Sequence, residues 1–241
     1  MKKFYLIGKD VDASLSPYIH NYVYRYLKIE AQYEARSLDS PDQIAAIFSD
    51  LSKGDVHGVN ITSPYKMNAF NYINFCDRSA QEIGSINCIS KERESIKGFN
   101  TDWIGFMKTI KGRTIDNAKI IGYGGAGRAI EYALLLAGIK NIEVYTRQKI
   151  KHPNNVIYKN IDQAFNFQDQ KNNIIINATP YHFLNEINFD IFLLLLSEKI
   201  FWIDLLYTKL STERKKYLNK NIYKNGLDML IYQALASVDI W

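Results

Sequence analysis

A short apolar run, a glycine-rich turn and the start of an amphipathic stretch follow one another at Lys119–Ile130. Gly122, Gly124 and Gly127 have the G-x-G-x-x-G spacing. In a βα unit the first glycine permits a tight turn, the second lets the backbone approach a pyrophosphate, and the third lets the helix pack closely on the strand. The phosphates then lie on the N–H groups at the helix start. Because a predicted strand precedes the glycines and a predicted helix follows them, the segment favours a dinucleotide site over a plain βα turn.

The rest of the chain alternates apolar runs with amphipathic stretches, which is typical of an α/β fold with a mostly parallel sheet. Strands are expected at 3–7, 33–37, 56–61, 119–121, 141–145, 174–176 and 200–203, with a hairpin at 86–97. Helices are expected at 18–27, from 40 onward, at 102–111, from the glycine turn to 137, and at 227–241. The second of these helices begins at Ser40 with Pro41 in its first position, and four apolar residues at helical spacing support it: Ile44, Ile47, Phe48 and Leu51.

The composition is that of a globular chain. Of 241 residues, 47% are apolar and 23% are charged, which is enough to bury a sizeable core. The net charge of +5 is mild and no lysine–arginine block alternates with aromatic residues, so a small anionic ligand fits better than a nucleic-acid surface. Cys76 and Cys88 form no C-x-x-C pattern, so we expect two buried thiols rather than a metal site or a disulfide framework.

Neither a targeting signal nor a membrane span is predicted. Only four apolar residues precede Gly8, which is too few for a signal peptide. The apolar run at 192–196 is far shorter than a membrane-spanning helix. We therefore expect a soluble cytoplasmic protein. The sequence leaves open whether it is a monomer or a homodimer.

Polar residues gather at the start of the first predicted helix. Ser14 and Ser16 combine two hydroxyls with helix-start N–H groups, an arrangement that suits a carboxylate. The alternative for Ser16 is a simple N-cap. His20 lies inside the helix and is expected to be a packed or surface residue rather than a catalyst.

A second polar group follows the predicted strand at 56–61. Asn60, Thr62 and Lys66 lie at its carboxyl end, where ligands bind in open α/β sheets. A lone lysine is more often a solvated surface charge. Asp102 begins the predicted helix at 102–111, where an acid is either functional or an N-cap.

Together with segments from the second half of the chain, these segments form an ordered series of eight motifs, and the series is more specific than any single motif. The motifs are Ser-x-Ser-Pro-x-x-His-Asn at 14–21, Gly-x-Asn-x-Thr-x-Pro-x-Lys at 58–66, Ile-Gly-Ser-Ile-Asn at 83–87, Gly-x-Asn-Thr-Asp at 98–102, the glycine turn, Asn-Ala-Thr-Pro at 177–180, Asp-Leu-Leu-Tyr at 204–207 and Gly-Leu-Asp-Met-Leu-Ile-Tyr-Gln at 226–233. With these motifs, from Ser14 to Gln233, the chain resembles the shikimate dehydrogenase family.

The resemblance implies two α/β domains with the active site in the cleft between them. Residues 1–102 would form a substrate-binding domain with a mostly parallel sheet, to which the helix at 227–241 returns, and residues 103–226 a Rossmann-like NADP-binding domain. The implied reaction is the reversible reduction of 3-dehydroshikimate to shikimate by NADPH, in aromatic amino acid (chorismate) biosynthesis.

The resemblance also implies residue roles. Lys66 and Asp102 would be the catalytic pair beside the reacting oxygen. An ammonium there stabilises and can protonate the oxygen that becomes negative when hydride reaches the carbonyl carbon. Which of the two transfers the proton stays open. Ser14 and Ser16 would hold the substrate carboxylate, and its hydroxyls and ring would be bound by Asn60, Thr62, Asn87, Tyr207 and Gln233.

The choice of cofactor depends on the end of the predicted strand at 141–145. An NAD site usually carries an acid about 20 residues beyond the glycines, whereas this strand is followed by Thr146, Arg147 and further cations. This favours a 2′-phosphate, hence NADP, although Lys151 lacks the guanidinium fork and leaves a weaker NADP preference open. By the resemblance, the cofactor residues are Gly122, Gly124, Gly125, Ala126, Gly127, Thr146, Arg147, Lys151, Thr179, Leu205, Gly226 and Met229.

The sequence departs from the family's usual pattern at three places. His152–Asn155 interrupts a stretch that normally continues as a helix, so this helix is expected to be absent. Tyr181–His182 lacks the usual glycine, and Thr208–Lys209 lacks the proline expected after Tyr207. The chain also stops at Trp241, where relatives run on. Two alternatives stay open: a quinate/shikimate dehydrogenase with relaxed substrate or cofactor use, and a non-catalytic ligand-binding relative.

Overall fold

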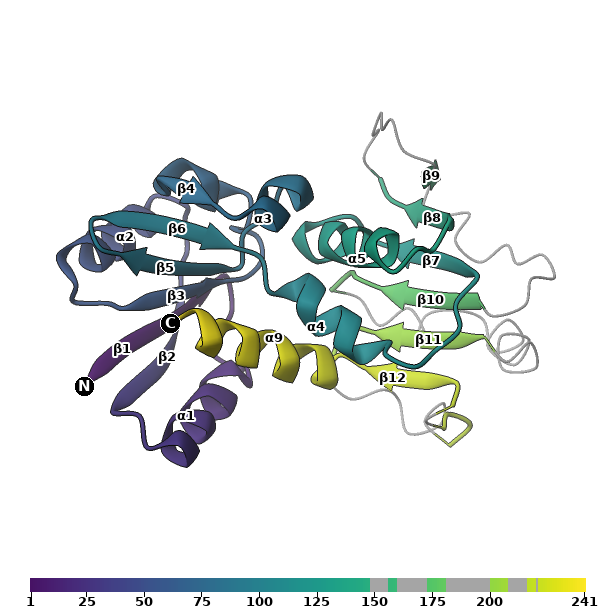
Figure 1. Ribbon diagram of the computed structural model, residues 1–241, viewed down its shortest axis with the longest axis horizontal. Coiled ribbons are helices and arrows are strands. Elements are labelled where there is room, and N and C mark those ends of the chain that lie inside the picture. The colour runs from purple at the N-terminus through teal and green to yellow at the C-terminus, as the bar shows by residue number, and fades with distance from the viewer. Residues whose placement is uncertain (148–155, 160–172, 181–199, 208–215, 220) are drawn as a thin grey trace. The chain divides into compact units, whose positions relative to one another are not determined.

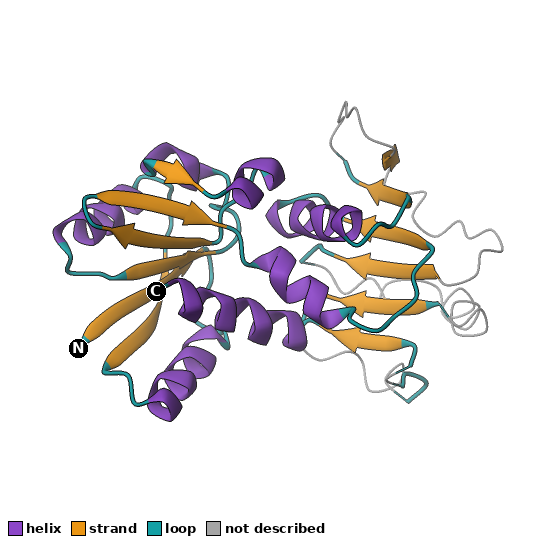
Figure 2. Cartoon of the chain, viewed as in Figure 1, coloured by secondary structure: helices purple, strands orange, loops and turns teal. Residues whose placement is uncertain are grey.

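The computed structural model describes residues 1–147, 156–159, 173–180, 200–207, 216–219 and 221–241, which form two compact units. The first unit comprises Met1–Phe106 and Leu230–Trp241, and the second comprises Met107–Met229. Each unit holds one six-stranded sheet (Figures 1 and 2). The domain limits expected from the sequence differ from these limits by a few residues.

The first unit is built around a mixed sheet with the strand order β2-β1-β3-β5-β6-β4. Its elements are β1 (Lys2–Gly8), α1 (Ser16–Leu27), β2 (Ala31–Ser37), α2 (Gln43–Lys53), β3 (Gly58–Ile61), η1 (Asn68–Tyr72), β4 (Phe75–Cys76), α3 (Arg78–Ile83), β5 (Cys88–Glu92), β6 (Ser95–Phe99), the first part of α4 (Asp102–Thr109) and most of α9 (Leu227–Ile240). β1 pairs in parallel with β2 and β3, and β4 pairs in parallel with β6, whereas β5 is antiparallel to both of its neighbours. The expectation of a mostly parallel sheet therefore holds, with the predicted hairpin as its antiparallel part.

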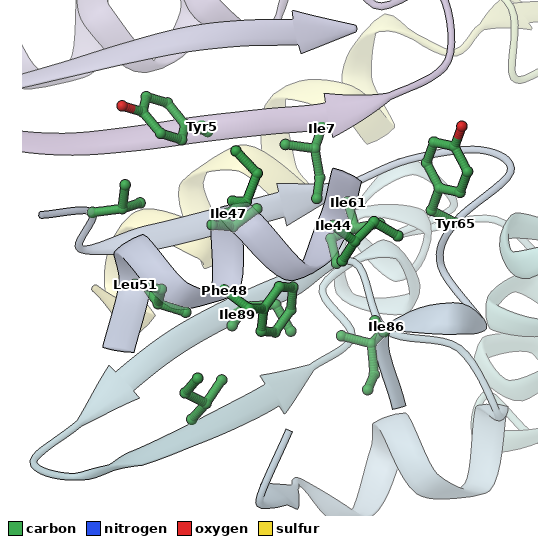
Figure 3. Packing of buried hydrophobic residues seen from close by; sticks show 14 of the residues in the cluster. Tyr5, Ile7, Ile44, Ile47, Phe48, Leu51, Ile61, Tyr65, Ile86 and Ile89 are labelled. Carbon is green, nitrogen blue, oxygen red and sulfur yellow. The ribbon is translucent and has the colours of Figure 1, made fainter. Parts of the chain in front are cut away.

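Alternation along β1 builds a core on each face of this sheet, because successive side chains of a strand point to opposite faces. Tyr5 and Ile7 lie in one apolar cluster with α2 and β3, and Figure 3 shows the α2 side chains over the sheet. Phe4 and Leu6 lie in the other cluster, which includes Tyr24 of α1. Burying an aliphatic or aromatic side chain contributes about 1.5–3 kcal/mol, so these two clusters hold the sheet between its helices.

α2 shows which part of a sequence-based prediction is reliable. Its four predicted apolar positions are all buried: Ile44, Ile47, Phe48 and Leu51. The predicted first helical position, Pro41, was two residues too early, and the helix begins at Gln43. The side chain of Gln43 accepts hydrogen bonds from the N–H groups of Asp39 and Ser40, which keeps the preceding residues in a turn.

The second unit has a parallel sheet with the order β12-β11-β10-β7-β8-β9. Its described elements are the rest of α4, β7 (Asn117–Ile121), α5 (Gly125–Leu136), β8 (Asn141–Tyr145), β9 (Val156–Lys159), β10 (Asn173–Asn177), β11 (Phe201–Asp204), β12 (Tyr223–Asn225) and the first residues of α9. All its strand pairs are parallel. The strand order reverses at β7, between β8 and β10, and ligands bind outside the carboxyl ends of strands at such a switch point.

The predicted strands of this unit are confirmed, whereas β9 and β12 were not expected. The predicted loss of a helix at His152–Asn155 and the apolar run at 192–196 lie outside the described residues, as do 181–182 and 208–209. Among the helices that the structure describes, none is long and apolar enough to cross a membrane.

Candidate active site

Lys66 and Asp102 form a largely buried ion pair in the first unit. Lys66 follows β3, and its Nζ lies 2.5 Å from Asp102 Oδ2, with side-chain exposures of 12% and 8%. Asp102 is the first residue of α4, where the helix dipole favours a negative charge. Its backbone N–H donates to the side chain of Asn100, so Asn100 closes the helix start and the Asp102 carboxylate is left for other partners.

Asn87 holds the other oxygen of that carboxylate. Its Nδ2 donates to Asp102 Oδ1 at 2.8 Å and to Thr101 Oγ1 at 3.0 Å, while its Oδ1 accepts from the Thr101 N–H at 2.7 Å. The Asp102 carboxylate thus binds Lys66 through one oxygen and Asn87 through the other. Lys66 is therefore not a solvated surface lysine, and the carboxylate of Asp102 does not serve as a helix cap.

Asn60 lies behind Asn87 and has all its polar atoms bound. Its Oδ1 accepts from the Tyr33 hydroxyl at 2.8 Å, and its Nδ2 donates to the Asn87 carbonyl at 2.9 Å and to Ser237 Oγ at 3.0 Å. The residue is 4% exposed. Asn60 therefore holds Asn87 in place, and both N–H groups of its side-chain amide are already bound.

The last helix brings Gln233 to the same network. Gln233 Oε1 lies 3.4 Å from both Asn87 Nδ2 and Thr101 Oγ1. One turn later, the fully buried Ser237 Oγ lies 3.3 Å from Thr101 Oγ1. Sequence reasoning missed Thr101 and Ser237 as members of this network. Their signals were the position directly before Asp102, and the i+4 spacing from Gln233 that places two residues on one helix face.

The remaining predicted substrate residues differ in their surroundings. Ser14 Oγ accepts from the Ser16 N–H at 3.2 Å, and Ser16 is the first helical residue of α1 rather than its N-cap. Thr62 directly follows β3 and is partly exposed, with its methyl in the space that a Cβ on Gly8 would fill. Tyr207 belongs to the second unit and is partly buried.

Two further titratable residues are buried without a catalytic arrangement. His20 stacks on Tyr33 with ring centroids 4.0 Å apart, and burial lowers its pKa from 6.5 to about 3, so the ring is neutral. Of the two environments predicted for His20, packed or at the surface, the packed one is confirmed. Burial raises the pKa of the Cys88 thiol to about 12, which keeps it protonated. No group of metal-ligating side chains occurs among the described residues.

The glycine turn lies between β7 and α5 in the second unit. Gly122 has φ +94°, and a Cβ there would meet the methyl of Thr179 at 2.6 Å. A Cβ on Gly127 would lie 2.3 Å from the Gly122 carbonyl oxygen, whereas a Cβ on Gly124 would point into open space. Gly124 precedes α5 without a capping side chain. The first N–H groups of α5, from Gly125, Ala126 and Gly127, have no acceptor within their helix, so the turn fits a bound pyrophosphate.

The end of β8 lies next to this turn in sheet order. Thr146 is buried, and Arg147 is exposed directly beyond it. The acid of β8, Glu143, is bound by Lys119, Lys159 and the Tyr145 hydroxyl. Among the described residues, Arg147 is thus the charged residue directly beyond the end of β8. Lys151 lies outside the described residues. The arrangement fits a 2′-phosphate.

The other predicted cofactor residues lie at the ends of β10, β11 and β12. Thr179 is partly exposed and its hydroxyl donates to Asn177 Oδ1 at 2.7 Å. Leu205 follows β11, and a Cβ on Gly226 would come within 1.9 Å of its carbonyl oxygen. Met229 is buried in the first turn of α9.

Comparisons with known proteins agree with this geometry. Residues 6–89 match the family model described as shikimate dehydrogenase substrate binding domain. A relative from Caldicellulosiruptor bescii, named shikimate dehydrogenase (NADP(+)), is 33% identical over 260 residues, which cover 100% of this chain and 89% of the relative. A relative of the same name from Clostridium beijerinckii is 32% identical, covering 100% of this chain and 92% of the relative.

Solved structures give the same result. The crystal structure of shikimate dehydrogenase 1 from Peptoclostridium difficile superposes with a TM-score of 0.83 at 30% identity, covering 100% of this chain and 92% of that one. A shikimate dehydrogenase structure in complex with NADP+ superposes with a TM-score of 0.80 at 29% identity, covering 100% and 90%.

Proposed function

The chain belongs to the shikimate dehydrogenase family, and from this premise we propose which of its residues carry the reaction. It is an NADP-dependent oxidoreductase that acts on a CH–OH group. The reaction is the interconversion of shikimate and 3-dehydroshikimate, a step of aromatic amino acid biosynthesis. The names of the relatives do not favour the quinate-using or non-catalytic alternatives.

The buried pair of Lys66 and Asp102 is the observation that carries the catalytic assignment. NADPH, when bound, supplies a hydride to the C3 carbonyl carbon of 3-dehydroshikimate. Lys66 Nζ stabilises the negative charge that develops on the carbonyl oxygen and delivers a proton to it. Asp102 and Asn87 fix the direction of Nζ, since one carboxylate oxygen binds the lysine and the other binds the asparagine. In the oxidation direction, Lys66 accepts the same proton from the C3 hydroxyl.

The substrate contacts are assigned as the family resemblance implies. We assign the carboxylate to the hydroxyls of Ser14 and Ser16, and the ring hydroxyls to Thr62, Asn87 and Gln233. Asn60 stays in the predicted substrate set, and it also supports Asn87 from behind through the contacts of its side chain. Tyr207 completes the predicted set.

For the cofactor, we assign the pyrophosphate to the glycine turn, Gly122–Gly127, including Gly125 and Ala126. The adenosine 2′-phosphate is assigned to Thr146, Arg147 and Lys151. Thr179, Leu205, Gly226 and Met229 then lie on the nicotinamide side. Residues 1–102 with 227–241 would act as the substrate domain and 103–226 as the NADP domain. A cytoplasmic location, a monomer or homodimer and the absence of a nucleic-acid partner are also part of the proposal.

Steady-state kinetics test the catalytic assignment. Purified protein is mixed with shikimate or quinate and with NADP or NAD, and the absorbance of the reduced nicotinamide is followed. We expect turnover with shikimate and NADP. Replacing Lys66→Ala should lower kcat by at least about 100-fold, the range that general acid–base catalysis contributes, while the Kd of NADPH stays unchanged.

Lys53→Ala is the matched control, because Lys53 is an exposed lysine at the end of α2 in the same unit. It should leave kcat unchanged. Absence of turnover with every substrate and cofactor pair would contradict the enzyme assignment. A Lys66→Ala variant with wild-type kcat would contradict the site assignment alone.

A further inference from the structure

Two buried polar residues of the second unit have no role in the proposal so far. Asn177 ends β10 and Asp204 ends β11, and the two residues are partners in the parallel register. Both are 0% exposed. Asn177 Nδ2 donates to Asp204 Oδ1 at 3.1 Å. Burying a carboxylate is costly unless hydrogen bonds compensate it, so the position of this pair calls for an explanation.

One side of the pair controls Thr179 and, through it, the glycine turn. Asn177 Oδ1 accepts hydrogen bonds from both the N–H of Thr179, at 3.0 Å, and its Oγ1, at 2.7 Å. These two bonds fix the side-chain rotamer of Thr179. Its methyl then lies against Gly122, where a Cβ would be only 2.6 Å away. Asn177 therefore determines where the first glycine of the turn can lie.

The other side of the pair controls the ends of β11 and β12. Asp204 Oδ1 also accepts from the Leu206 N–H at 3.2 Å, and the Leu205 N–H donates to the Asn177 carbonyl at 3.0 Å. The Leu205 carbonyl in turn occupies the space that a Cβ on Gly226 would need. The chain that follows β11 is thus held in register with β10 by the same two residues.

We propose that Asn177 and Asp204 are positioning residues for the dinucleotide. Together they hold the pyrophosphate-binding turn and the Leu205–Gly226 contact, which the proposed function places on the nicotinamide side, at fixed positions relative to each other. Neither side chain needs to touch the cofactor. The proposal rests on the use of NADP by this chain and adds two residues to the cofactor site that the sequence reasoning had not assigned.

The pair can be tested by reversing it. Asn177→Asp keeps the oxygen that accepts from Thr179 but places two carboxylates side by side. Asp204→Asn keeps the shape of the side chain and removes its charge. The double variant Asn177→Asp/Asp204→Asn restores one amide and one carboxylate with the hydrogen bond reversed. Asn141→Asp is the control, because Asn141 is an exposed asparagine at the opposite end of β8 in the same unit.

Binding of NADPH is measured by the fluorescence of its nicotinamide, and binding of shikimate by calorimetry, on full-length protein whose folding is checked by circular dichroism. We expect Asn177→Asp to raise the Kd of NADPH by about tenfold or more, since the amide donor to Asp204 is lost and two buried carboxylates repel each other until one takes up a proton. The double variant should recover most of that loss. The Kd of shikimate should change by less than about twofold, and Asn141→Asp should bind NADPH as the wild type does.

Binding of a cofactor fragment distinguishes a positioning role of the pair from a general loss of structure in the second unit. Adenosine 2′-monophosphate carries the 2′-phosphate but lacks both the pyrophosphate and the nicotinamide, so its Kd should change much less than that of NADPH. Equal losses for both ligands, or folded single variants with wild-type Kd for NADPH, would overturn the proposal.

If Asn177→Asp does not fold, Thr179→Val replaces it. This variant removes the hydroxyl that binds Asn177 and keeps a methyl, and the same comparison of the two ligands applies. Turnover by the wild type tests the proposed function independently of these binding measurements.

Discussion

Ser237 shows how one small side chain can organise a site from behind. It is fully buried on α9, and its hydroxyl donates to the Gln233 carbonyl at 3.1 Å. The same oxygen accepts from Asn60 and lies next to the hydroxyl of Thr101. These contacts connect the helix that carries Gln233 with the residues that hold Asn87 and Asp102. His20, which stacks on Tyr33, is instead a neutral ring.

Replacing Ser237→Ala should disturb the site more than the fold. The change leaves the Asn60 amide and the Thr101 hydroxyl short of a partner, which costs about 1–3 kcal/mol. We expect that loss in urea unfolding, together with a several-fold lower kcat and an unchanged Kd for NADPH. Ser52→Ala is a matched control, since Ser52 also donates to the carbonyl four residues earlier, that of Phe48, but lies on the surface. Wild-type kcat in Ser237→Ala would argue against a positioning role.

At the level of elements, the length of a helix determined whether it could be recognised from the sequence. α2 and α5 span 11 and 12 residues, so their apolar periodicity is visible. α3 has six residues, and its stability comes from its ends: Asp77 accepts from the N–H groups of Ser79 and Ala80, and Gly84 adopts φ +67°. Strand length does not decide recognition in the same way, because β9 has four residues and was not expected, whereas β3 and β11 have four residues each and were predicted.

The turn between β7 and α5 combines two kinds of glycine, and substitution should separate them. Gly124→Ala places a Cβ in open space, so the melting temperature should stay unchanged while the methyl blocks the close approach of a pyrophosphate. We expect the Kd of NADPH to rise by at least about tenfold, or about 1.4 kcal/mol. Gly122→Ala forces a non-glycine residue to φ +94° against Thr179, which should cost about 1–3 kcal/mol of stability. Equal melting temperatures for the two variants would contradict this distinction.

At the level of the whole molecule, the chain forms two units, and its end belongs to the first of them. Residues 230–241 are part of the first unit, although the preceding 123 residues form the second. Gln233 thereby lies within hydrogen-bonding distance of Asn87, 146 positions earlier. Trp241 is held in the same unit, with its indole N–H donating to the Ile89 carbonyl at 2.9 Å and its ring stacked on Phe4. Lys66 and Asp102 on one hand and the glycine turn on the other therefore belong to different units.

This separation predicts that cofactor preference can be changed without affecting the substrate. Arg147→Ala should raise the KM for NADP by about tenfold or more, because it removes a charge-assisted bond to the 2′-phosphate. The kinetics with NAD and the Kd of shikimate should stay unchanged. Lys140→Ala serves as the control, since Lys140 is an exposed cation just before β8. An equal rise of KM for NADP and NAD would mean that Arg147 does not contact the 2′-phosphate.

The sequence by itself determined the features that depend on local order. The spacing of Gly122, Gly124 and Gly127 specifies the turn, because backbone conformation and close approach require glycine at fixed offsets. The ordered motifs around Lys66 and Asp102 identified the family. The strand at 174–176 could be recognised because buried strands of parallel sheets read as apolar runs.

Only the tertiary structure decided which polar groups are already bound. Asn60 has the same motif position whether it contacts a ligand or supports Asn87, and its contacts with Tyr33 and Ser237 come from residues 27 and 177 positions away. The pairing of Asn177 with Asp204 likewise depends on the register between β10 and β11. Hydrogen-bond partners of buried groups are fixed by the packing of distant elements, and that information is not contained in local sequence.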